Sequence, residues 1–202
     1  MGDMFPRPLR DVAEQLARLP GYGPKSALRA ALALLGMPRE QADSLGRAIL
    51  TLRERLCFCS YCNALSEFDL CPICSDPART SEQMVLVGDW DSLLALEGGG
   101  FFRGRYFVLG GLLAPLDNVG ADQLAFGRLR ERLAQGEVEE LILALGTTME
   151  AEATASYVKN MVESDFPTVR VTRLAQGIPL GSEVRYVDKE TLRQSLLHRQ
   201  KL

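Results

Sequence analysis

The chain has 202 residues, which is enough for one large domain or two smaller ones. Hydrophobic residues make up 47% of it and charged residues 24%, a balance typical of a globular protein. The longest apolar run, AALALLGM, is far shorter than the roughly 20 apolar residues needed to cross a bilayer. The opening MGDMFPRPLRDVAEQ has no apolar core. We therefore expect a cytoplasmic protein with neither a secretory signal nor a transmembrane helix.

The formal net charge of −3 is distributed unevenly along the chain. Residues 1–56 hold nine Lys and Arg against six Asp and Glu, whereas residues 57–202 hold fourteen against twenty. A mild basic excess in the first segment makes it the place where a contact with nucleic acid is expected.

The first structural pattern in chain order is PLRDVAEQLARLPGYGPKSALRAALALLG. Its apolar residues recur every three or four positions over residues 8–19, which predicts an amphipathic helix. A Gly-Tyr-Gly turn follows, and Pro24 is suited to the first position of a second helix because its missing N–H has no partner there. The alanine- and leucine-rich stretch 25–35 continues that helix. The sequence thus predicts two helices joined by a glycine hairpin.

This hairpin has features that suit a phosphate ligand. Gly21 and Gly23 allow the backbone to come close to a ligand, and the following helix offers unpaired N–H groups at its positive end. Lys25 and Arg29 lie one turn apart at that end, so a grip on the sugar–phosphate backbone without base readout is predicted. The alternative is an ordinary two-helix corner. A third helix is predicted over 38–56, with apolar residues that pack on the hairpin.

The five cysteines lie within residues 57–74. Four of them form two C-x-x-C pairs with eight residues between: Cys59, Cys62, Cys71 and Cys74. Four thiolates at this spacing predict one structural Zn²⁺ without an open coordination position; a redox dithiol pair and an iron–sulfur cluster are the alternatives. Cys57 lies outside the pattern and is expected to be a small apolar residue at the end of a helix, or a spare sulfur at the rim. The only histidine, His198, is expected at the surface.

From residue 83 the pattern alternates between strands and helices. Strands are expected over 83–88, 105–111, 139–145 and 168–175, with a possible fifth over 183–187. Helices are expected over 89–99, 121–136, 149–164 and 189–199. This alternation predicts a parallel sheet covered on both faces.

Two acidic pairs follow expected strands, Asp89 with Asp91 and Glu150 with Glu152. They are compatible either with a cluster that holds magnesium or with capping of the helices that follow. The sequence contains neither G-x-x-x-x-G-K-[ST] nor a G-x-G-x-x-G that opens a helix, so nucleotide hydrolysis and dinucleotide binding lack support.

The order of these motifs resembles the RecR family of bacterial recombination mediator proteins. The segments that carry the resemblance are LPGYGPKSA, CSYCNALSEFDLCPIC, GRYFVLGG, APLDNVG, EAEAT and RLAQGIPLGSEVRYVD. They span the chain from about Leu9 to Arg199. The resemblance implies an α/β protein in four parts: a helix-hairpin-helix region at 1–56, a four-cysteine zinc finger at 57–77, a Toprim domain at 78–175, and a C-terminal segment at 176–202 with a Walker B-like strand and a helix.

The family's function is implied in the same way. RecR proteins are similar to DNA clamps: subunits assemble into a ring, commonly a tetramer, around DNA. They act with RecO, and often RecF, to help RecA load at gaps and breaks in DNA repair, and their Toprim domain would bind a partner without catalysis. On this chain the resemblance assigns DNA contacts to Gly21, Gly23, Lys25 and Arg29, zinc ligands to the four paired cysteines, and partner contacts to Glu150 and Glu152. It also implies a nucleoid-associated protein without catalytic residues.

The chain departs from a catalytic Toprim domain at three positions. Such a domain needs a glutamate after its first strand and D-x-D after its third, where this chain has Gly88, and Gly146 with Thr148. The chain also departs from the RecR family itself, because the family's usual SPL reads APL here, with Ala114. The alternative function is a magnesium-dependent Toprim enzyme, a primase or nuclease, and the missing carboxylates argue against it. A small-molecule α/β enzyme would leave the hairpin unexplained.

Overall fold

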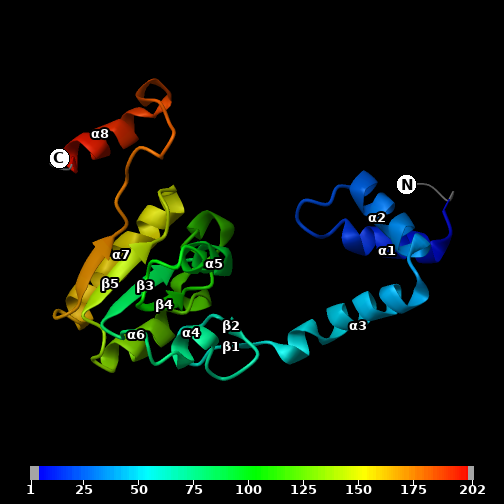
Figure 1. Cartoon of the computed structure of the whole chain (residues 1–202), viewed down its shortest axis with the longest axis horizontal. Helices are drawn as coiled ribbons and strands as arrows, with labels where there is room; N and C mark the ends of the chain where they lie inside the picture. Colours follow the sequence, from blue (N-terminus) through cyan, green and yellow to red (C-terminus); the bar gives the residue numbers. More distant parts are fainter. Residues whose placement is uncertain (1–4, 200–202) are drawn as a thin grey trace. The chain divides into compact units, whose positions relative to one another are not determined.

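The structure is a computed structural model that describes residues 5–199. The chain divides into two compact units, the first ending at Arg55 and the second beginning at Leu56 (Figure 1). Among residues 5–199, the first unit is helical and the strands lie in the second.

The first unit consists of three helices: α1 (Arg7–Leu16), α2 (Pro24–Gly36) and α3 (Arg39–Arg55). The predicted helix, hairpin, helix order is confirmed, and Pro24 opens α2 as its sequence position indicated. Helices α1 and α2 contact each other, and the buried residues of these two helices are Ala13, Ala27 and Ala31. Small side chains at these positions let the two helix backbones approach closely.

The expectation that the third helix packs its apolar residues on the hairpin is wrong in this structure. Every residue of α3 is at least partly exposed, including Leu45, Ile49 and Leu50. The chain leaves α2 through Met37, which has an extended backbone as residues before proline tend to have. Large apolar side chains of α1 and α2 stay exposed as well, among them Val12, Leu32 and Leu35.

The second unit is built on a four-stranded sheet. Its strands are β3 (Gln83–Val87), β4 (Arg105–Val108), β5 (Glu140–Ala144) and β6 (Arg170–Arg173), in the order β4-β3-β5-β6. All three pairings are parallel, as predicted. Val87 aligns with Val108 on one side and with Ala144 on the other, so the carboxyl ends of three strands meet at one edge of the sheet.

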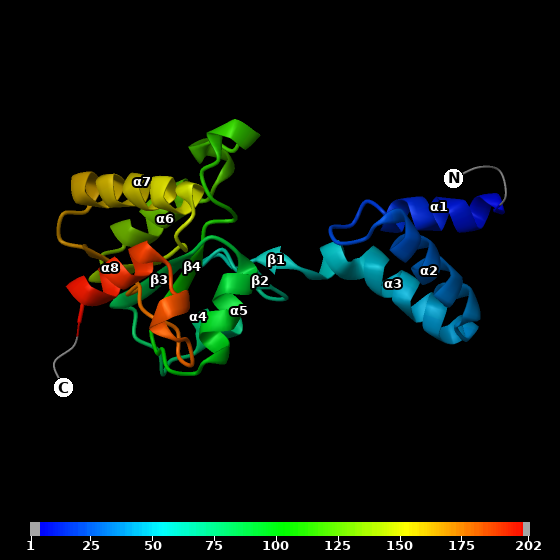
Figure 2. The same ribbon diagram turned by 90° about the horizontal axis from the view of Figure 1, so that it is seen from above.

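Both faces of this sheet are covered (Figure 2). Helices α6 (Phe126–Ala134) and α7 (Met149–Asp165) lie on one face, and their apolar side chains pack with those of the strands in a large core. Helix α5 (Trp90–Gly98) lies on the other, where Leu93 belongs to a second buried cluster together with the four paired cysteines, Val85, Val87, Tyr106 and Val108. The cysteine segment is therefore part of the second core, a role that the alternation of strands and helices did not predict.

Two predicted elements of this unit need correction. The expected helix 121–136 is broken into the 3-10 helix η2 (Ala121–Gln123) and α6, because Leu124 is extended and Ala125 donates its N–H to Leu109 O at 3.0 Å. The possible fifth strand is the 3-10 helix η3 (Val184–Tyr186). Its alternating side chains, Val184 and Tyr186, are exposed, and the backbone is satisfied by local turn bonds.

The remaining elements are short. The cysteine segment contains the antiparallel pair β1 (Cys57–Phe58) and β2 (Leu65–Ser66) and the helix α4 (Pro72–Ser75). The 3-10 helix η1 (Pro115–Asp117) lies in the loop after β4. The predicted C-terminal helix is present as α8 (Lys189–Leu197), and Asp188 caps its first turn.

Candidate metal centre and nucleic-acid interface

The first cysteine pair is held by a tight turn between β1 and β2. Cys59 donates its N–H to Ala64 O at 2.7 Å, and Asn63 donates its N–H to Cys59 O at 3.0 Å. Asn63 closes this turn in the left-handed conformation, with φ 59°, which asparagine tolerates better than most residues. The turn directs the side chains of Cys59 and Cys62 to the same buried place.

The second pair is held by the first turn of α4. Cys71 is the N-cap of this helix, Pro72 is its first residue, and the Cys71 sulfur accepts the N–H of Cys74 at 3.4 Å. The Cys71 N–H in turn donates to the Cys59 sulfur at 3.3 Å, which links the two pairs. N–H groups directed at sulfur stabilise thiolates, the form that binds metal.

The four sulfurs form a compact buried group. They lie within 4.8 Å of one another, and those of Cys62 and Cys71 are 3.5 Å apart. In a tetrahedral zinc site the sulfurs are about 3.8 Å apart, because each Zn–S bond is about 2.3 Å long. Among residues 5–199 this is the one group of three or more Cys, His, Asp or Glu side chains placed to hold a metal ion.

A hydrogen bond between two of the thiols shifts their pKa values in opposite directions. A hydrogen bond from the Cys62 thiol lowers the pKa of Cys71, and the same bond raises the pKa of Cys62. The lowered pKa favours the thiolate form of Cys71, which is the form that binds metal. A divalent cation at the centre would favour the thiolate form of all four.

Cys57 lies outside the metal group, as its position outside the C-x-x-C pairs indicated. It is exposed and belongs to β1, so the expectation that it ends a helix is wrong; α3 ends two residues earlier. Its thiol donates to the carbonyl oxygens of Ser66 and Phe68 at 3.4 and 3.3 Å. His198 is exposed, as expected.

The glycine hairpin leaves the N-terminus of α2 open. Gly21 has φ +82°, a conformation that favours glycine, whereas Gly23 is the extended N-cap with free space where a side chain would point. No side chain caps the first turn, all of which the structure describes, and that turn contains no acidic residue. Lys25 and Arg29 are both exposed on this helix. The positive end of α2, its free N–H groups and two cations thus face solvent together.

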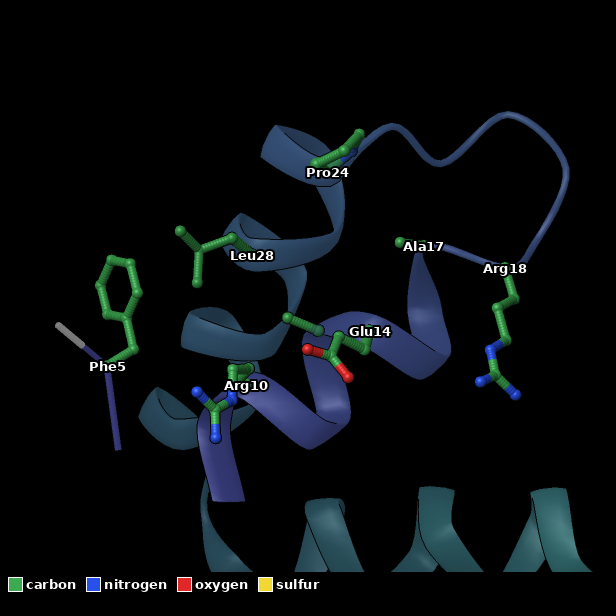
Figure 3. Close-up of a pocket in the computed structure, with 8 residues that line it drawn as sticks. Phe5, Arg10, Glu14, Ala17, Arg18, Pro24 and Leu28 are labelled. Atoms are coloured by element: carbon green, nitrogen blue, oxygen red, sulfur yellow. The ribbon is translucent and has the colours of Figure 1, made fainter. Parts of the chain in front are cut away.

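Two hollows flank the hairpin. Gly21 and Arg29 line an open one of about 470 Å³ with Tyr22. The other, of about 390 Å³, lies between α1 and α2, and Figure 3 shows Glu14 of α1, Leu28 of α2 and Phe5 ahead of α1 around it. The residues predicted to bind DNA do not line this second hollow.

The acidic residues at the carboxyl edge of the sheet do not form the magnesium cluster that was one interpretation of the sequence. Asp89 is the N-cap of α5 and accepts the Ser92 N–H at 2.7 Å. Glu152 instead forms a two-bond ion pair with Arg173, at 2.6 and 3.2 Å, and the hydrogen bond from Arg173 lowers its pKa. Glu150 is exposed in the first turn of α7. The capping interpretation is confirmed for Asp89.

The positions that carry the carboxylates of a catalytic Toprim domain are shaped for other residues. A side chain at Gly88 would meet Leu112 at 3.1 Å, and Gly146 has φ +78°. Thr148 is the N-cap of α7, where its side chain accepts the Ala151 N–H at 3.2 Å. The backbone and packing at this edge thus agree with the missing acidic residues.

Comparison with known families matches the chain along most of its length. Four family models fit consecutive segments: the RecR helix-hairpin-helix at 9–52, the RecR four-cysteine zinc finger at 56–76, the Toprim domain at 82–175 and the RecR C-terminal segment at 177–200. A recombination protein RecR from Maridesulfovibrio salexigens is 60% identical over 198 residues, 98% of each chain.

The chain belongs to the RecR family. Further relatives that share this name are 58% identical in Nitratidesulfovibrio vulgaris, over 98% of each chain, and 41% identical in Acaryochloris marina, over the full length of both. The resemblance seen in the sequence motifs is thereby confirmed, as are the α/β fold class and the family's role in recombination. Within residues 5–199, no helix is both long enough and apolar enough to span a membrane.

Family membership also decides between the cofactors considered for the cysteine group. This RecR-family chain has a four-cysteine zinc finger, and its four buried sulfurs are placed to hold one Zn²⁺. Zinc with four thiolates has no open position, so its contribution is structural. When bound, it would fix the turn before β2 and the turn of α4 to each other.

Sequence reasoning missed the residues that attach this zinc finger to the sheet. Arg128 of α6 donates to Cys59 O at 2.7 Å, and Arg105 of β4 donates to Cys74 O at 2.7 Å. Arg132 is buried, lies 3.7 Å from the centre of the Tyr61 ring and pairs with Glu137, whose other partner is the Tyr61 hydroxyl. In the sequence these arginines belong to ordinary charged helix and strand patterns, so no local signal distinguishes them.

Proposed function

We propose that this chain is a DNA clamp that mediates recombinational repair and catalyses no reaction itself. Copies of it form a ring, commonly of four, around DNA. With RecO, and with RecF where it occurs, the ring helps RecA to load at gaps and breaks. Membership of the RecR family supports this role. It would act in the cytoplasm, associated with the nucleoid.

The observation that carries the proposal is the open N-terminus of α2. We assign DNA contacts to Gly21, Gly23, Lys25 and Arg29, because a helix end without a cap or an acidic residue attracts phosphate. Both cations are exposed, so they can reach a phosphate without a change in the fold. Contacts of this kind bind the backbone of any DNA sequence.

A ring explains how a site with only two cations could hold DNA. One hairpin with two cations gives weak binding, but several hairpins on one ring raise the effective concentration of each for the same DNA. Binding should therefore depend on assembly, and it should weaken steeply with salt because each phosphate contact releases counterions.

The second unit would bind zinc and a partner. We propose Cys59, Cys62, Cys71 and Cys74 as the zinc ligands, and the exposed Glu150 and the neighbouring Glu152 as partner contacts. Glu152 and Arg173 line a cavity of about 820 Å³ with residues of the C-terminal segment, which offers an acidic, concave surface to a partner. We propose no catalytic role for this unit, because Gly88 and Gly146 stand where a catalytic Toprim domain has metal-binding carboxylates.

We propose that these roles follow the four segments implied by the family resemblance. Residues 1–56 bind DNA, 57–77 bind zinc and 78–175 bind a partner, and 176–202 form the C-terminal segment. The helix-hairpin-helix, zinc finger, Toprim and C-terminal family models, which match residues 9–52, 56–76, 82–175 and 177–200, support this division.

The proposal is tested by the salt dependence of DNA binding. Fluorescence anisotropy of a labelled duplex should show affinity for the full-length protein that falls linearly on a plot of log K against log salt concentration. Lys25→Glu with Arg29→Glu should lower the affinity at least tenfold, and the slope should shrink by about 0.9 for each phosphate that is no longer neutralised. The circular dichroism spectrum should stay unchanged, because both side chains are exposed.

A matched control separates the effect of the hairpin site from the effect of net charge on DNA binding. Lys159→Glu with Lys189→Glu makes the same change in net charge at two exposed lysines of the second unit. This variant should bind DNA almost as well as the parent protein. Equal losses in the two variants would show that the hairpin is not the site, and cleavage of DNA in the presence of magnesium would contradict the non-catalytic role.

A further inference from the structure

Two arginines of the sheet and its covering helix hold the zinc-binding residues, one for each cysteine pair. Arg128 of α6 donates through Nη2 to the carbonyl oxygen of Cys59 at 2.7 Å. Arg105 of β4 donates through Nη1 to the carbonyl oxygen of Cys74 at 2.7 Å. Both guanidinium groups are partly buried in these contacts. Each cation therefore lies directly against the backbone of a metal ligand.

Asn63 extends the Arg128 contact into a short network. Its Oδ1 accepts a hydrogen bond from Arg128 Nη1, and its Nδ2 donates to Val108 O at 2.7 Å. The Val108 N–H donates to Cys62 O at 2.9 Å. Since β4 is an edge strand of the sheet, these two bonds use the free edge of Val108 to hold the residues Cys62 and Asn63.

The charge of the metal centre gives these arginines a role beyond packing. One Zn²⁺ with four thiolates carries a net charge of −2, and burying that charge is costly unless cations or hydrogen-bond donors lie nearby. A guanidinium group supplies both, and its planar fork also fixes the direction of the groups it binds. In other metal sites, partners of the ligands affect metal affinity by about ten- to a hundredfold.

We propose that Arg128 and Arg105 are positioning residues of the zinc centre, with Asn63 as the link between Arg128 and the sheet edge. They orient the two cysteine pairs and offset the negative charge of the zinc–thiolate group. Zinc affinity is thereby coupled to the integrity of the second unit. This role of the two arginines does not depend on the proposed DNA clamp.

The test compares two arginines of the same helix. Arg128→Met removes the contacts to Cys59 and Asn63, whereas Arg130→Met removes only an exposed ion pair with Asp165 at 3.2 Å. Competition between the full-length protein and a chromogenic chelator measures Zn²⁺ affinity. We expect Arg128→Met to bind Zn²⁺ about ten- to a hundredfold more weakly, and Arg130→Met to match the parent protein. Arg128→Lys should recover part of the loss, because it keeps the charge without the fork.

A second readout separates positioning of the metal from general stability. The thermal midpoint of each variant is measured with Zn²⁺ and again after chelation. A positioning role lowers the midpoint of the zinc-loaded protein more than that of the chelated protein, and it changes the d–d absorption of the Co²⁺-substituted site. If both midpoints fall equally and the Co²⁺ spectrum is unchanged, the arginines serve packing alone and the proposal is wrong.

Asn63→Gly gives an independent route if Arg128→Met fails to fold. Glycine keeps the left-handed backbone at this position, so the variant removes the side-chain link without straining the turn. Its Zn²⁺ affinity should fall at least threefold, because Arg128 loses one of its two acceptors. An affinity equal to that of the parent protein would contradict the link.

Discussion

The two units of this chain stabilise themselves in different ways. The second unit buries large apolar side chains on both faces of its sheet, among them Phe107, Leu129 and Leu141, and adds a metal centre. In the first unit, the buried residues among 5–55 are three alanines, while Leu50 of α3 is 77% exposed and Leu35 of α2 is 72% exposed.

This difference bears on what each unit needs in order to stay folded. Burying a methylene group contributes about 0.8 kcal/mol, so an alanine contact between two helices contributes little against the entropy of ordering them. The second unit has a buried apolar cluster on each face of its sheet. The first unit exposes the apolar surface that contacts with other copies would cover, in keeping with the proposed ring.

The largest effect is expected at the zinc ligands. Cys71→Ser leaves three thiolates, so the protein should lose its zinc and the second unit should lose at least about 3 kcal/mol of its free energy of unfolding. Cys57→Ser, which changes the exposed cysteine outside the group, should keep both. Zinc content and urea unfolding measure the two variants. Full zinc content in Cys71→Ser would contradict the ligand assignment.

Shortening one leucine side chain in each unit tests the difference in packing between the two units directly. Leu141→Ala empties a fully buried position in the sheet and should cost about 2–5 kcal/mol. Leu50→Ala, in contrast, should change the unfolding of an isolated subunit by less than about 0.5 kcal/mol, because its side chain is largely exposed. Urea unfolding of both variants at low protein concentration gives the values. Similar costs would mean that α3 is packed within its own chain.

A smaller effect is expected at the hairpin. Gly21→Ala places a methyl group on a residue with φ +82° and should cost about 1–2 kcal/mol. Gly23→Ala should be close to neutral for stability, because Gly23 is extended and has free space around it. Thermal unfolding compares the two. A neutral Gly21→Ala would show that the hairpin adopts another conformation.

The smallest effect concerns the ion pair at the carboxyl edge. The hydrogen bond from Arg173 lowers the pKa of Glu152, so the pair stabilises the fold above the usual carboxyl pKa and this contribution is lost as the pH falls through the lowered value. Both side chains are about half exposed, so the contribution is below about 1 kcal/mol. The difference in unfolding free energy between Glu152→Gln and the parent should therefore shrink on acidification from pH 7 to pH 3. A difference in unfolding free energy that stays constant with pH would contradict a stabilising ion pair between Glu152 and Arg173.

Local patterns predicted much of this molecule. The C-x-x-C spacing identified the four cysteines that the fold brings together, because such a pair closes a short turn by itself. The parallel sheet followed from the order of strands and helices, and Pro24 marked the start of α2. The cysteine and proline signals lie within a few neighbouring residues, and each strand or helix in the alternation has a local pattern of its own.

Features that depend on distant residues were not predicted. Arg128 meets Cys59 across 69 positions and Arg105 meets Cys74 across 31, so neither interaction leaves a local pattern. The apolar residues of α3 indicate a buried face but not which surface covers it. Residues 183–187 alternate like a strand, yet the chain forms η3 there, since a strand also requires a partner.

The measurement that tests the account most directly is the mass of the full-length protein in solution, combined with its retention on DNA. Multi-angle light scattering should detect a four-subunit species, and this species should stay on closed circular DNA at raised salt and leave when the circle is cut. Solitary subunits that bind circular and linear DNA equally would contradict the clamp.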